Sequence, residues 1–265
     1  MNTFIIVLFI LNVPIKKINF IGNKSISTGD LQQEIVSQKN IEFYDANITY
    51  DTEKILRVYN NHGFFSTEVT PDVKATEEAV EIIFTIKEGP RPKIDSIGIY
   101  GISRNGIDHL FTIRVGDYFI AEKIDVTEKK IENYYKNRGY PFAVVTSSQK
   151  PDSGILAFDI ETGVIHYIRQ INLHGLKFCN PNVVMREIEL KSGDMYSKEK
   201  LYNSQREIYG LGFFSTIDVE MLKDEPDTLD LLFTVRELKS RILNLGLGFS
   251  IPVSFLFSFG LEELN

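Results

Sequence analysis

The sequence is poor in the residues that build catalytic, metal and redox sites. It contains four histidines, one cysteine and no tryptophan in 265 residues. A single cysteine, Cys179, excludes an intrachain disulfide framework, and no nucleophile signature surrounds it. The histidines, His62, His109, His166 and His174, lie in different segments without the paired spacing of zinc ligands. We therefore expect no catalytic residue, no metal site and no cofactor.

Positive charge is also in deficit. The chain has 29 Lys and Arg against 36 Asp and Glu, a formal net charge of −7. Such a surface does not neutralise phosphates, so nucleic acid is not an expected partner. The acid pairs Glu77 with Glu78 and Glu262 with Glu263 are interpreted as solvated surface, because no positioned acid and base accompany them. A hydrolase with a hidden site would need a convergent polar set that the sequence does not show.

Long apolar runs are missing as well. The segment from Thr3 to Val13 is almost wholly apolar but shorter than the roughly 20 residues of a membrane helix. It resembles a signal-peptide core, although no Lys or Arg precedes it and no small-x-small site follows. Two interpretations stay open: a degenerate secretion signal, or an accidental start inside a longer gene. In both, residues 1–14 precede the first repeat.

What the sequence does contain is a threefold repeat. A helical run ends at Gly63, Gly139 and Gly212, and an aromatic residue and a β-branched run follow each time. These glycines are 76 and 73 residues apart, which is too long for a solenoid repeat. Glycine adopts the left-handed cap conformation without a Cβ penalty, and the β-branched run is typical of a strand. Each repeat is therefore predicted to be a small domain.

A second landmark has the same period. Alternating apolar strands end at Gly22, Gly101 and Gly175, which are 79 and 74 residues apart. Between the two landmarks lie two helical segments, of which the first is short. The predicted first segments are Thr28 to Gln38, Arg104 to Phe111 and Pro181 to Ile188, with Thr28 as a cap and Pro181 in a first turn.

Each unit closes with a strand rich in aliphatic residues, which suits a central position in a sheet. The unit therefore follows the order strand, helix, helix, strand, strand, and the last two strands form a hairpin. The expected fold class is α+β: three tandem βααββ domains, each a three-stranded mixed sheet with two helices on one face. Their predicted bounds are 15–89, 90–163 and 164–238.

The tail, residues 239–265, differs from the repeats because it alternates with a strict period of two. Such alternation is typical of membrane-barrel strands, and it predicts the start of an incomplete outer-membrane β-barrel. The alternative is a sticky hairpin that caps the last repeat. The predicted membrane-facing residues are Leu243, Leu245, Leu247, Phe249, Phe255, Phe257 and Phe259.

Three such units, each with the helix-glycine-aromatic step, resemble polypeptide-transport-associated (POTRA) domains over about Ile15 to Leu238. The segments Leu245 to Ser250 and Phe259 to Asn265 resemble the first barrel strands of the BamA/TamA outer-membrane assembly superfamily. The resemblance implies repeats in the periplasm and a barrel in the bacterial outer membrane. It implies unfolded outer-membrane proteins as clients, with periplasmic chaperones or accessory lipoproteins as further partners. The alternative within this resemblance is the POTRA region of a two-partner secretion pore.

With the last strand of each unit central, the second strand is left at an edge, with free N–H and C=O groups for an extended client. The predicted client-binding residues are Val69, Thr70, Val73, Val144, Val145, Thr146, Ile217, Asp218 and Val219. The alternative is that these edges merely face solvent. In that case Pro71, Lys150 with Pro151, and the acidic Asp218 and Glu220 would protect them.

Overall fold

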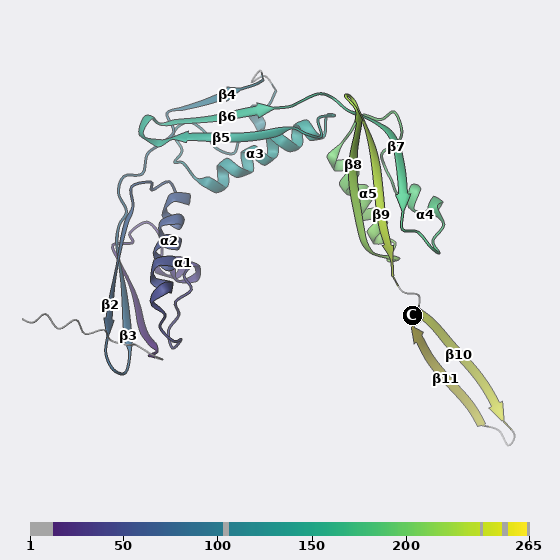
Figure 1. Cartoon of the computed structure of the whole chain (residues 1–265), viewed down its shortest axis with the longest axis horizontal. Helices are drawn as coiled ribbons and strands as arrows, with labels where there is room; N and C mark the ends of the chain where they lie inside the picture. Colours follow the sequence, from purple (N-terminus) through teal and green to yellow (C-terminus); the bar gives the residue numbers. More distant parts are fainter. Residues whose placement is uncertain (1–12, 103–105, 239–240, 251–253, 264–265) are drawn as a thin grey trace, which may run out of the picture. The chain divides into compact units, whose positions relative to one another are not determined.

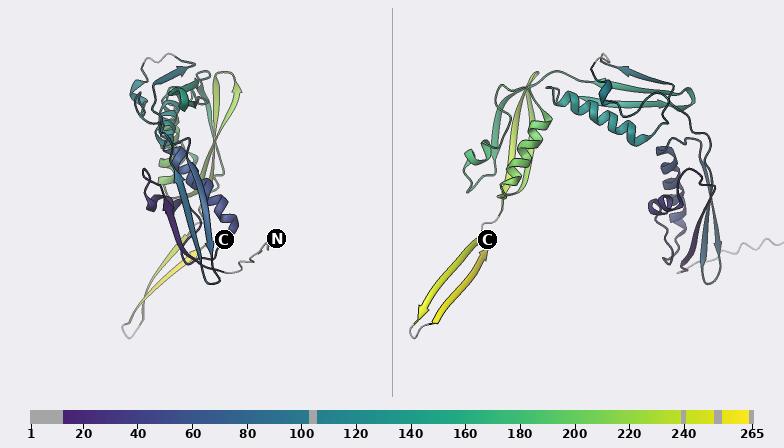
Figure 2. Two further views of the ribbon diagram at one scale, coloured as in Figure 1. Left: turned by 90° about the vertical axis from the view of Figure 1, so that its left-hand side faces the viewer. Right: turned by 180° about the vertical axis from the view of Figure 1, so that it is seen from behind.

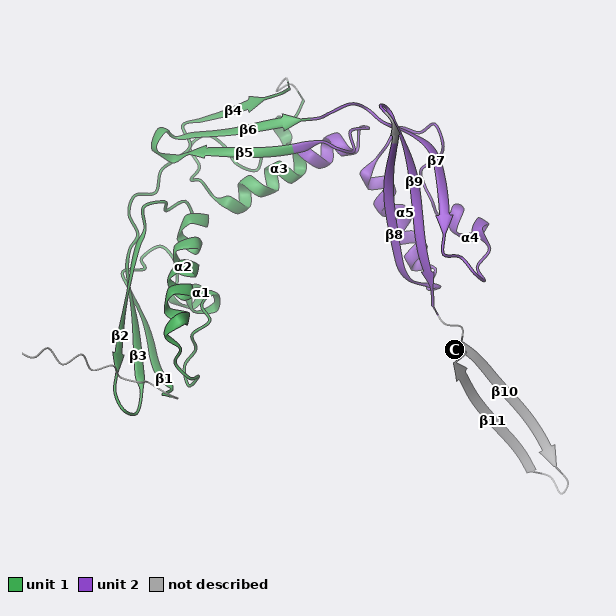
Figure 3. Cartoon of the chain, viewed as in Figure 1, with its two compact units in different colours: residues 1–131, 145–161 green, residues 132–144, 162–265 purple. Residues whose placement is uncertain are grey.

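The computed structural model describes residues 13–102, 106–238, 241–250 and 254–263, and side chains are described up to residue 238 apart from 224 and 225. The chain divides into two compact units, residues 1–131 with 145–161 and residues 132–144 with 162–265 (Figure 3). The predicted N-terminal apolar segment lies outside the described residues.

The first domain is built as strand, helix, helix, strand, strand (Figure 1). Its elements are β1 (Ile15–Ile21), α1 (Thr28–Glu34), α2 (Asp45–Asn61), β2 (Glu68–Ala75) and β3 (Val80–Lys87). The strand order is β1-β3-β2, with β1 parallel and β2 antiparallel to the central β3. On β3 the side chains at positions 80, 82, 84 and 86 are buried and their neighbours are more exposed. This alternation means that one face of the sheet packs on the helices.

The second domain has the same order of elements, with a short 3-10 helix in place of the first α-helix. Its elements are β4 (Ser96–Tyr100), η1 (Asp108–Leu110), α3 (Ala121–Lys136), β5 (Val144–Lys150), η2 (Pro151–Ser153) and β6 (Ile155–Glu161). The strand order is β4-β6-β5, and β4 is parallel to β6.

The third domain repeats the arrangement once more. Its elements are β7 (Tyr167–His174), α4 (Pro181–Met185), α5 (Lys198–Gly210), β8 (Phe214–Glu225) and β9 (Thr228–Glu237), in the strand order β7-β9-β8. A separate antiparallel hairpin follows, formed by β10 (Arg241–Ser250) and β11 (Ser254–Glu263). The structure describes the backbone of this hairpin but not its side chains, so the directions of the predicted membrane-facing side chains lie outside the described part of the chain.

The predicted fold class is confirmed: each of the three domains is a three-stranded mixed sheet with its helices on one face (Figures 1 and 2). The first and third domains have separate buried cores, centred on Phe84 and Phe233 of their central strands. The closing strand of each domain is central in its sheet, as its aliphatic sequence predicted.

The first helical segments are shorter than the sequence suggested, because a polar side chain on the second helix captures the backbone that follows them. Asp51 accepts the N–H groups of Val36 and Ser37 at 2.7 and 3.2 Å, which ends α1 at Glu34 instead of Gln38. In the third domain Ser204 accepts the N–H of Glu189 at 2.9 Å, four residues beyond the end of α4 at Met185. A buried carboxylate or hydroxyl thus replaces the next helical hydrogen bond.

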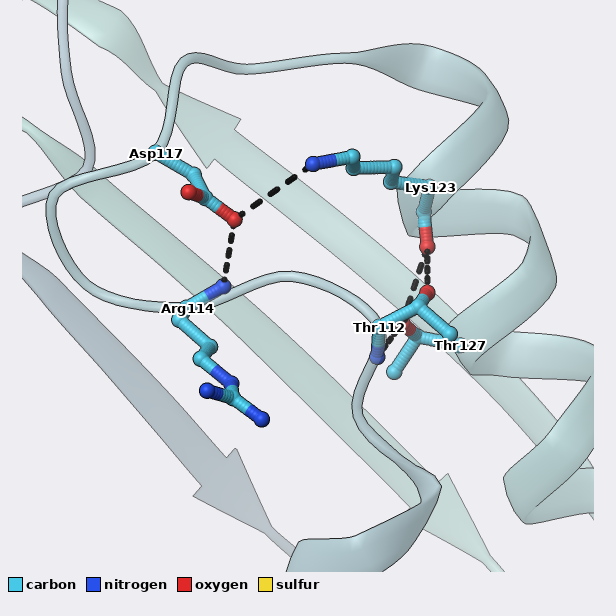
Figure 4. A network of polar contacts seen from close by, with 5 residues as sticks. All are labelled: Thr112, Arg114, Asp117, Lys123 and Thr127. Carbon is cyan, nitrogen blue, oxygen red and sulfur yellow. Dashed lines mark hydrogen bonds and ion pairs between the residues drawn. The ribbon is translucent and has the colours of Figure 1, made fainter.

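Thr127 on α3 has the same role in the second domain (Figure 4). Its hydroxyl accepts the N–H of Thr112 at 3.1 Å, fifteen residues earlier, and the hydroxyl of Thr112 donates to the carbonyl of Lys123 at 2.8 Å. The helix predicted for Arg104 to Phe111 is reduced to η1, because Gly106 has a φ of +90° that a right-handed helix cannot contain. Residues 103–105 of that prediction lie outside the described residues.

One predicted cap is wrong by a single residue. The N-cap of α1 is Ser27, whose side chain accepts the N–H of Asp30 at 3.1 Å, and Thr28 is the first helical residue. A serine hydroxyl at this position satisfies one of the free N–H groups of the first turn. Pro181 does occupy the first turn of α4, as predicted, behind an Asn180 cap.

The glycine and the aromatic residue after the second helix form one motif. In the first domain the N–H of Gly63 bonds the carbonyl of Asn60, and the N–H of Phe64 bonds that of Tyr59. This pair of bonds defines a Schellman cap, and the rings of Tyr59 and Phe64 make its hydrophobic contact with centroids 5.7 Å apart. Tyr135 and Tyr140 repeat this contact at 5.8 Å, with Gly139 between them in sequence. The sequence signature is therefore a helix stop.

The helix of the third domain is one turn shorter than the others. α5 has 13 residues, against 17 in α2 and 16 in α3. Ser204 of α5 corresponds to Asp51 of α2, because each accepts a backbone N–H from fifteen residues earlier in the chain. Counted from these two polar anchors, Ile208 corresponds to Ile55 of the first domain. Leu201 corresponds in the same way to Ile48, and all four side chains are buried. The turn that would carry an equivalent of Tyr59 is absent from α5, so only this third position of the buried helix face is missing from the repeat.

Candidate functional site

Each sheet has two edge strands, because its central strand pairs with both of the others. The second strands of the units, β2, β5 and β8, form one edge, and the first strands, β1, β4 and β7, form the other. An exposed strand edge can pair with an extended polypeptide, so both edges are candidates for client binding. Sequence reasoning considered only the second strands.

The edges formed by the first strands are obstructed. The register of β1 against β3 shifts between Ile15 and Lys17, and that of β7 against β9 shifts between Ile168 and Gln170. β4 has only five residues. Bulges, charged side chains and short strands are the features that protect natural edges from pairing. These edges are therefore poorer candidates than β2, β5 and β8.

Pro71 reveals which backbone groups of β2 face outward. It pairs with Phe84 of β3, and proline is tolerated in an edge strand only where its nitrogen faces away from the ladder. Since backbone direction alternates along a strand, Val69 and Val73 also direct their N–H and C=O groups outward. Pro71 itself offers no donor. The row of outward-facing backbone donors along β2 is therefore interrupted at its centre.

Along β5 no proline interrupts the row of outward-facing backbone N–H and C=O groups. Counted from the cap glycines, Val145 corresponds to Val69 and Ser147 to Pro71, so the N–H of Ser147 faces outward where β2 has none. From Val144 to Lys150 the strand contains no proline, and its only charged residue is Lys150 at the end. The side chain of Val145 is buried, while that of Val144 is half exposed. Of the three edges, β5 is thus the one that nothing within the strand blocks.

β8 is longer but less regular. Ile217 and Val219 pair with Val235 and Phe233, the positions that correspond to Val69 and Pro71 of the first sheet. The pairing with β9 shifts register near both ends of the strand. The exposed acidic side chains of Asp218 and Glu220 alternate with the outward residues. A client on this edge would therefore lie beside two carboxylates.

The predicted client-binding residues thus divide into two sets. The outward backbone groups belong to Val69, Val73, Val145, Ile217 and Val219. The remaining residues, Thr70, Val144, Thr146 and Asp218, direct their backbone to the central strand and their side chains to the face opposite the helices, because the two directions alternate together. Sequence reasoning had no signal for this division, which follows from the pairing of Pro71.

The six glycines predicted as turns and caps all have left-handed φ values, from +72° at Gly212 to +92° at Gly22. Gly22, Gly101 and Gly175 also approach the central strand closely. A Cβ on them would lie 2.1, 2.1 and 1.9 Å from the carbonyl oxygens of Ile86, Ile160 and Val235. These three positions therefore combine a backbone that L residues avoid with a lack of space for any side chain.

Two glutamates that sequence reasoning missed hold the loops after these glycines. Glu88 accepts the N–H and the hydroxyl of Ser25 at 2.7 and 2.8 Å and the hydroxyl of Tyr59 at 3.1 Å. Burial raises the pKa of Glu88, but these hydrogen bonds outweigh burial and leave the pKa below its usual value. Burial, and then the hydrogen bond to Glu88, raise the pKa of Tyr59. A glutamate at the C-terminal end of an aliphatic strand was the available signal.

Glu237 is the corresponding residue of the third domain. Its carboxylate accepts the backbone N–H groups of Lys177, Phe178 and Cys179 at 3.1, 3.1 and 2.8 Å. Burial raises its pKa, and the three N–H groups together lower it below the usual value. The loop between β7 and α4 is thereby fixed to the end of β9.

Other binding chemistry has little support in the described part of the chain. No group of three or more His, Cys, Asp or Glu there could hold a metal ion. A hollow of about 140 Å³ beside α2 is lined by Glu34, Lys54, Arg57, Val58, Asn61 and His62. Five of these six lining residues have polar or charged side chains. Within residues 13–102 and 106–238 and the hairpin strands, no helix combines the length and hydropathy that crossing a membrane requires.

Comparison with known proteins agrees with the architecture. The family model described as POTRA, surface antigen variable number repeat, matches residues 13–89, 92–163 and 166–238. A crystal structure of POTRA domains 3–5 of BamA from Haemophilus influenzae superposes with a TM-score of 0.60 at 21% identity, covering 86% of this chain and 97% of that one. This likeness shows the fold.

Curated relatives are similar over nearly the whole chain. The outer membrane protein assembly factor BamA of Nitratidesulfovibrio vulgaris is 27% identical over 95% of this chain, and that of Neisseria meningitidis is 23% identical over 96%. The chain spans only 34% and 35% of the length of these two relatives. With three matched repeats that cover most of its residues, the chain belongs to the POTRA family of surface antigen variable number repeats.

Proposed function

We propose that the chain is the periplasmic POTRA region of an outer-membrane protein assembly factor. In this proposal it binds unfolded β-barrel clients by adding them as strands to its sheet edges, and it passes them to an attached barrel in the outer membrane. The relatives named outer membrane protein assembly factors support the class of protein. Periplasmic chaperones or accessory lipoproteins would deliver the clients.

The hairpin β10–β11 is proposed as the start of the attached barrel. Its two strands have ten residues each and pair without a register shift, and a membrane strand needs about 9–11 residues. The sequence of β10 alternates Leu243, Leu245 and Leu247 with small or polar residues. This alternation is what one lipid face and one lumen face require.

The observation that carries the client proposal is the open edge of β5. β5 has seven residues without an internal proline and lies at the edge of its sheet, so its outward N–H and C=O groups are available to an extended client. Main-chain pairing would supply most of the affinity, so many client sequences should bind, each with a dissociation constant of about a micromolar or weaker. A protein that accepts many different unfolded clients needs such low sequence specificity.

The proposal is tested by titrating the isotopically labelled chain with a peptide copied from residues 241–250, which stands for a barrel strand. We expect saturable changes in the amide signals of β5, centred on Val145 and Ser147. A scrambled peptide of the same composition should bind as well, because the contacts are to the main chain. A polyproline peptide, which lacks donors, should not bind.

A different distribution of the signals would contradict the proposal. Changes confined to α2 and the hollow around Lys54 and Arg57 would indicate side-chain recognition of the peptide. Equal changes along β1, β4 and β7 would mean that bulges and charge do not protect the first-strand edges. The absence of any saturable change would exclude client capture by this chain alone.

A further inference from the structure

Phe178 has the largest exposed fraction among the large hydrophobic side chains that the structure describes, 86%, and the next, Tyr202, has 64%. It lies in the loop between β7 and α4. Isolated exposed hydrophobic residues are common and need no explanation by themselves. What distinguishes Phe178 is how the loop holds it and where the loop lies in the chain.

The loop is rigidly fixed around the exposed ring. Glu237 accepts the N–H of Phe178 itself and of both neighbours, Lys177 and Cys179. Leu176 and Cys179 pack against the core of the third domain. The backbone on both sides of Phe178 is therefore tied down while its side chain projects into solvent. A side chain on a loop that is already ordered loses little conformational entropy when it binds.

The first domain shows that this loop does not require an aromatic residue. Phe178 follows Gly175 by three residues, and Ser25 follows Gly22 by three. Ser25 bonds Glu88 with both its N–H and its hydroxyl, so the same loop is held equally well by a polar residue. The phenylalanine of the third domain therefore adds apolar surface that the fold does not need.

The chain places this surface next to the start of the hairpin. Glu237, which holds the loop, ends β9, and β10 begins at Arg241. Four residues span at most about 14 Å even when fully extended. If β10 is the first membrane strand, the Phe178 loop lies near the membrane surface, at the level where aromatic and basic side chains prefer to reside.

We propose that Phe178, with Lys177 beside it, inserts into the interface of the bilayer that holds the attached barrel. The ring would lie at the boundary of headgroups and acyl chains, and the ammonium group would lie among anionic headgroups. This inference rests on the proposed function, because it assumes that β10 enters the membrane. It assigns the third domain a role in fixing the repeats at the bilayer, separate from client capture at β5.

The absence of tryptophan from the sequence allows a direct test. Phe178→Trp gives the chain a single indole reporter, and Ser25→Trp is the matched control in the same loop of the first domain. Each folded variant of the 265-residue chain is mixed with vesicles of phosphatidylethanolamine and phosphatidylglycerol, with and without brominated acyl chains. We expect the emission of Phe178→Trp to shift to the blue and to be quenched by the brominated lipid. The emission of Ser25→Trp should not change.

Partitioning gives a second readout. Phe178→Ser, which copies the residue of the first domain, should bind these vesicles about tenfold more weakly than the parent, because a buried phenylalanine side chain is worth roughly that factor. Tyr202→Ser removes an exposed aromatic side chain from α5 and should bind like the parent. Circular dichroism checks that both variants are folded.

Two results would overturn the inference. One is an indole at position 178 that stays in water when vesicles are added. The other is a blue shift without lipid that grows with protein concentration, which would assign the ring to a protein contact. Titration of Phe178→Ser with the barrel-strand peptide separates this question from the proposed function: the variant should bind the peptide normally, whereas a parent that binds no peptide refutes client capture whatever the vesicles show.

Discussion

Gly175 lies so close to Val235 that a Cβ built on the glycine would fall 1.9 Å from the carbonyl oxygen of the valine. The same approach joins Gly22 to Ile86 and Gly101 to Ile160, so it is a feature of every repeat. At this point the loop after the first strand crosses the end of the central strand. A side chain there would push the two strands apart.

A pair of glycines separates this crowding from backbone strain. Gly175 and Gly193 both have a φ of +89°, but nothing lies within 4 Å of a Cβ at Gly193. We expect Gly193→Ala to lower the free energy of unfolding by about 1 kcal/mol through strain alone. Gly175→Ala should cost about 3 kcal/mol more, because the contact is with backbone that cannot rotate away. Urea unfolding measures the free energy of both variants. Equal losses of unfolding free energy would contradict a steric clash at Gly175.

The polar anchor of the first domain gives a second prediction. Asp51 is fully buried and accepts two backbone N–H groups. Asp51→Ala leaves both donors buried without a partner and should destabilise the first domain by about 3 kcal/mol. Glu53→Ala, on the exposed side of the same helix, should change stability by less than about 0.5 kcal/mol. Thermal unfolding by circular dichroism compares the two, and similar midpoints would show that the anchor is unimportant.

Acid should weaken the loop that presents Phe178. The folded-state pKa of Glu237 lies below its usual value of about 4.3. A lowered pKa means that its contribution to stability is complete above the unfolded pKa and is lost as pH falls through the folded one. Glu237→Gln should therefore have a flatter decline in unfolding free energy below about pH 4 than the parent. Glu220→Gln is the exposed control and should decline like the parent. If Glu237→Gln also declined like the parent, the ionisation of Glu237 would not contribute to stability.

Much of the fold was predictable because its signals are local. A helix followed by glycine and an aromatic residue marks a Schellman cap, as Tyr59, Gly63 and Phe64 show. Alternation in Ile97 and Ile99 before Gly101 marks a strand that ends in a tight turn. Three copies of both signals at one period leave few arrangements other than three βααββ domains.

The anchors were not predictable because their side chains differ. Asp51, Thr127 and Ser204 share a position and a hydrogen bond fifteen residues back, but they are a carboxylate and two hydroxyl groups in unlike sequences. Only the folded chain brings their partners near. The end of α1 depends on Asp51, and for this reason the helix predicted for the first domain was too long. In the second domain the left-handed φ of Gly106 shortens the helix.

The candidate edges were predicted as strands, but which of their backbone groups are free depends on long-range pairing. The register of Pro71 against Phe84 decides the direction for β2, and counting from Gly139 carries it to β5. Val145, one of the predicted client-binding residues, has a buried side chain. A proline there would disturb the core as well as the edge, so Ser147 is the better position.

Edge pairing at β5 can be tested by exchanging the residues at one position between two edges. Ser147→Pro gives β5 the residue that β2 carries in a folded sheet, and Pro71→Ser restores the missing donor to β2. The affinity of the peptide copied from residues 241–250 is measured for the parent and for both variants, after circular dichroism shows that each is folded. Ser147→Pro should bind the peptide about tenfold more weakly than the parent, because a ladder donor is lost and the ring blocks the approach of the client. Pro71→Ser should bind at least as tightly as the parent, whereas a folded Ser147→Pro variant with unchanged affinity would contradict edge pairing at β5.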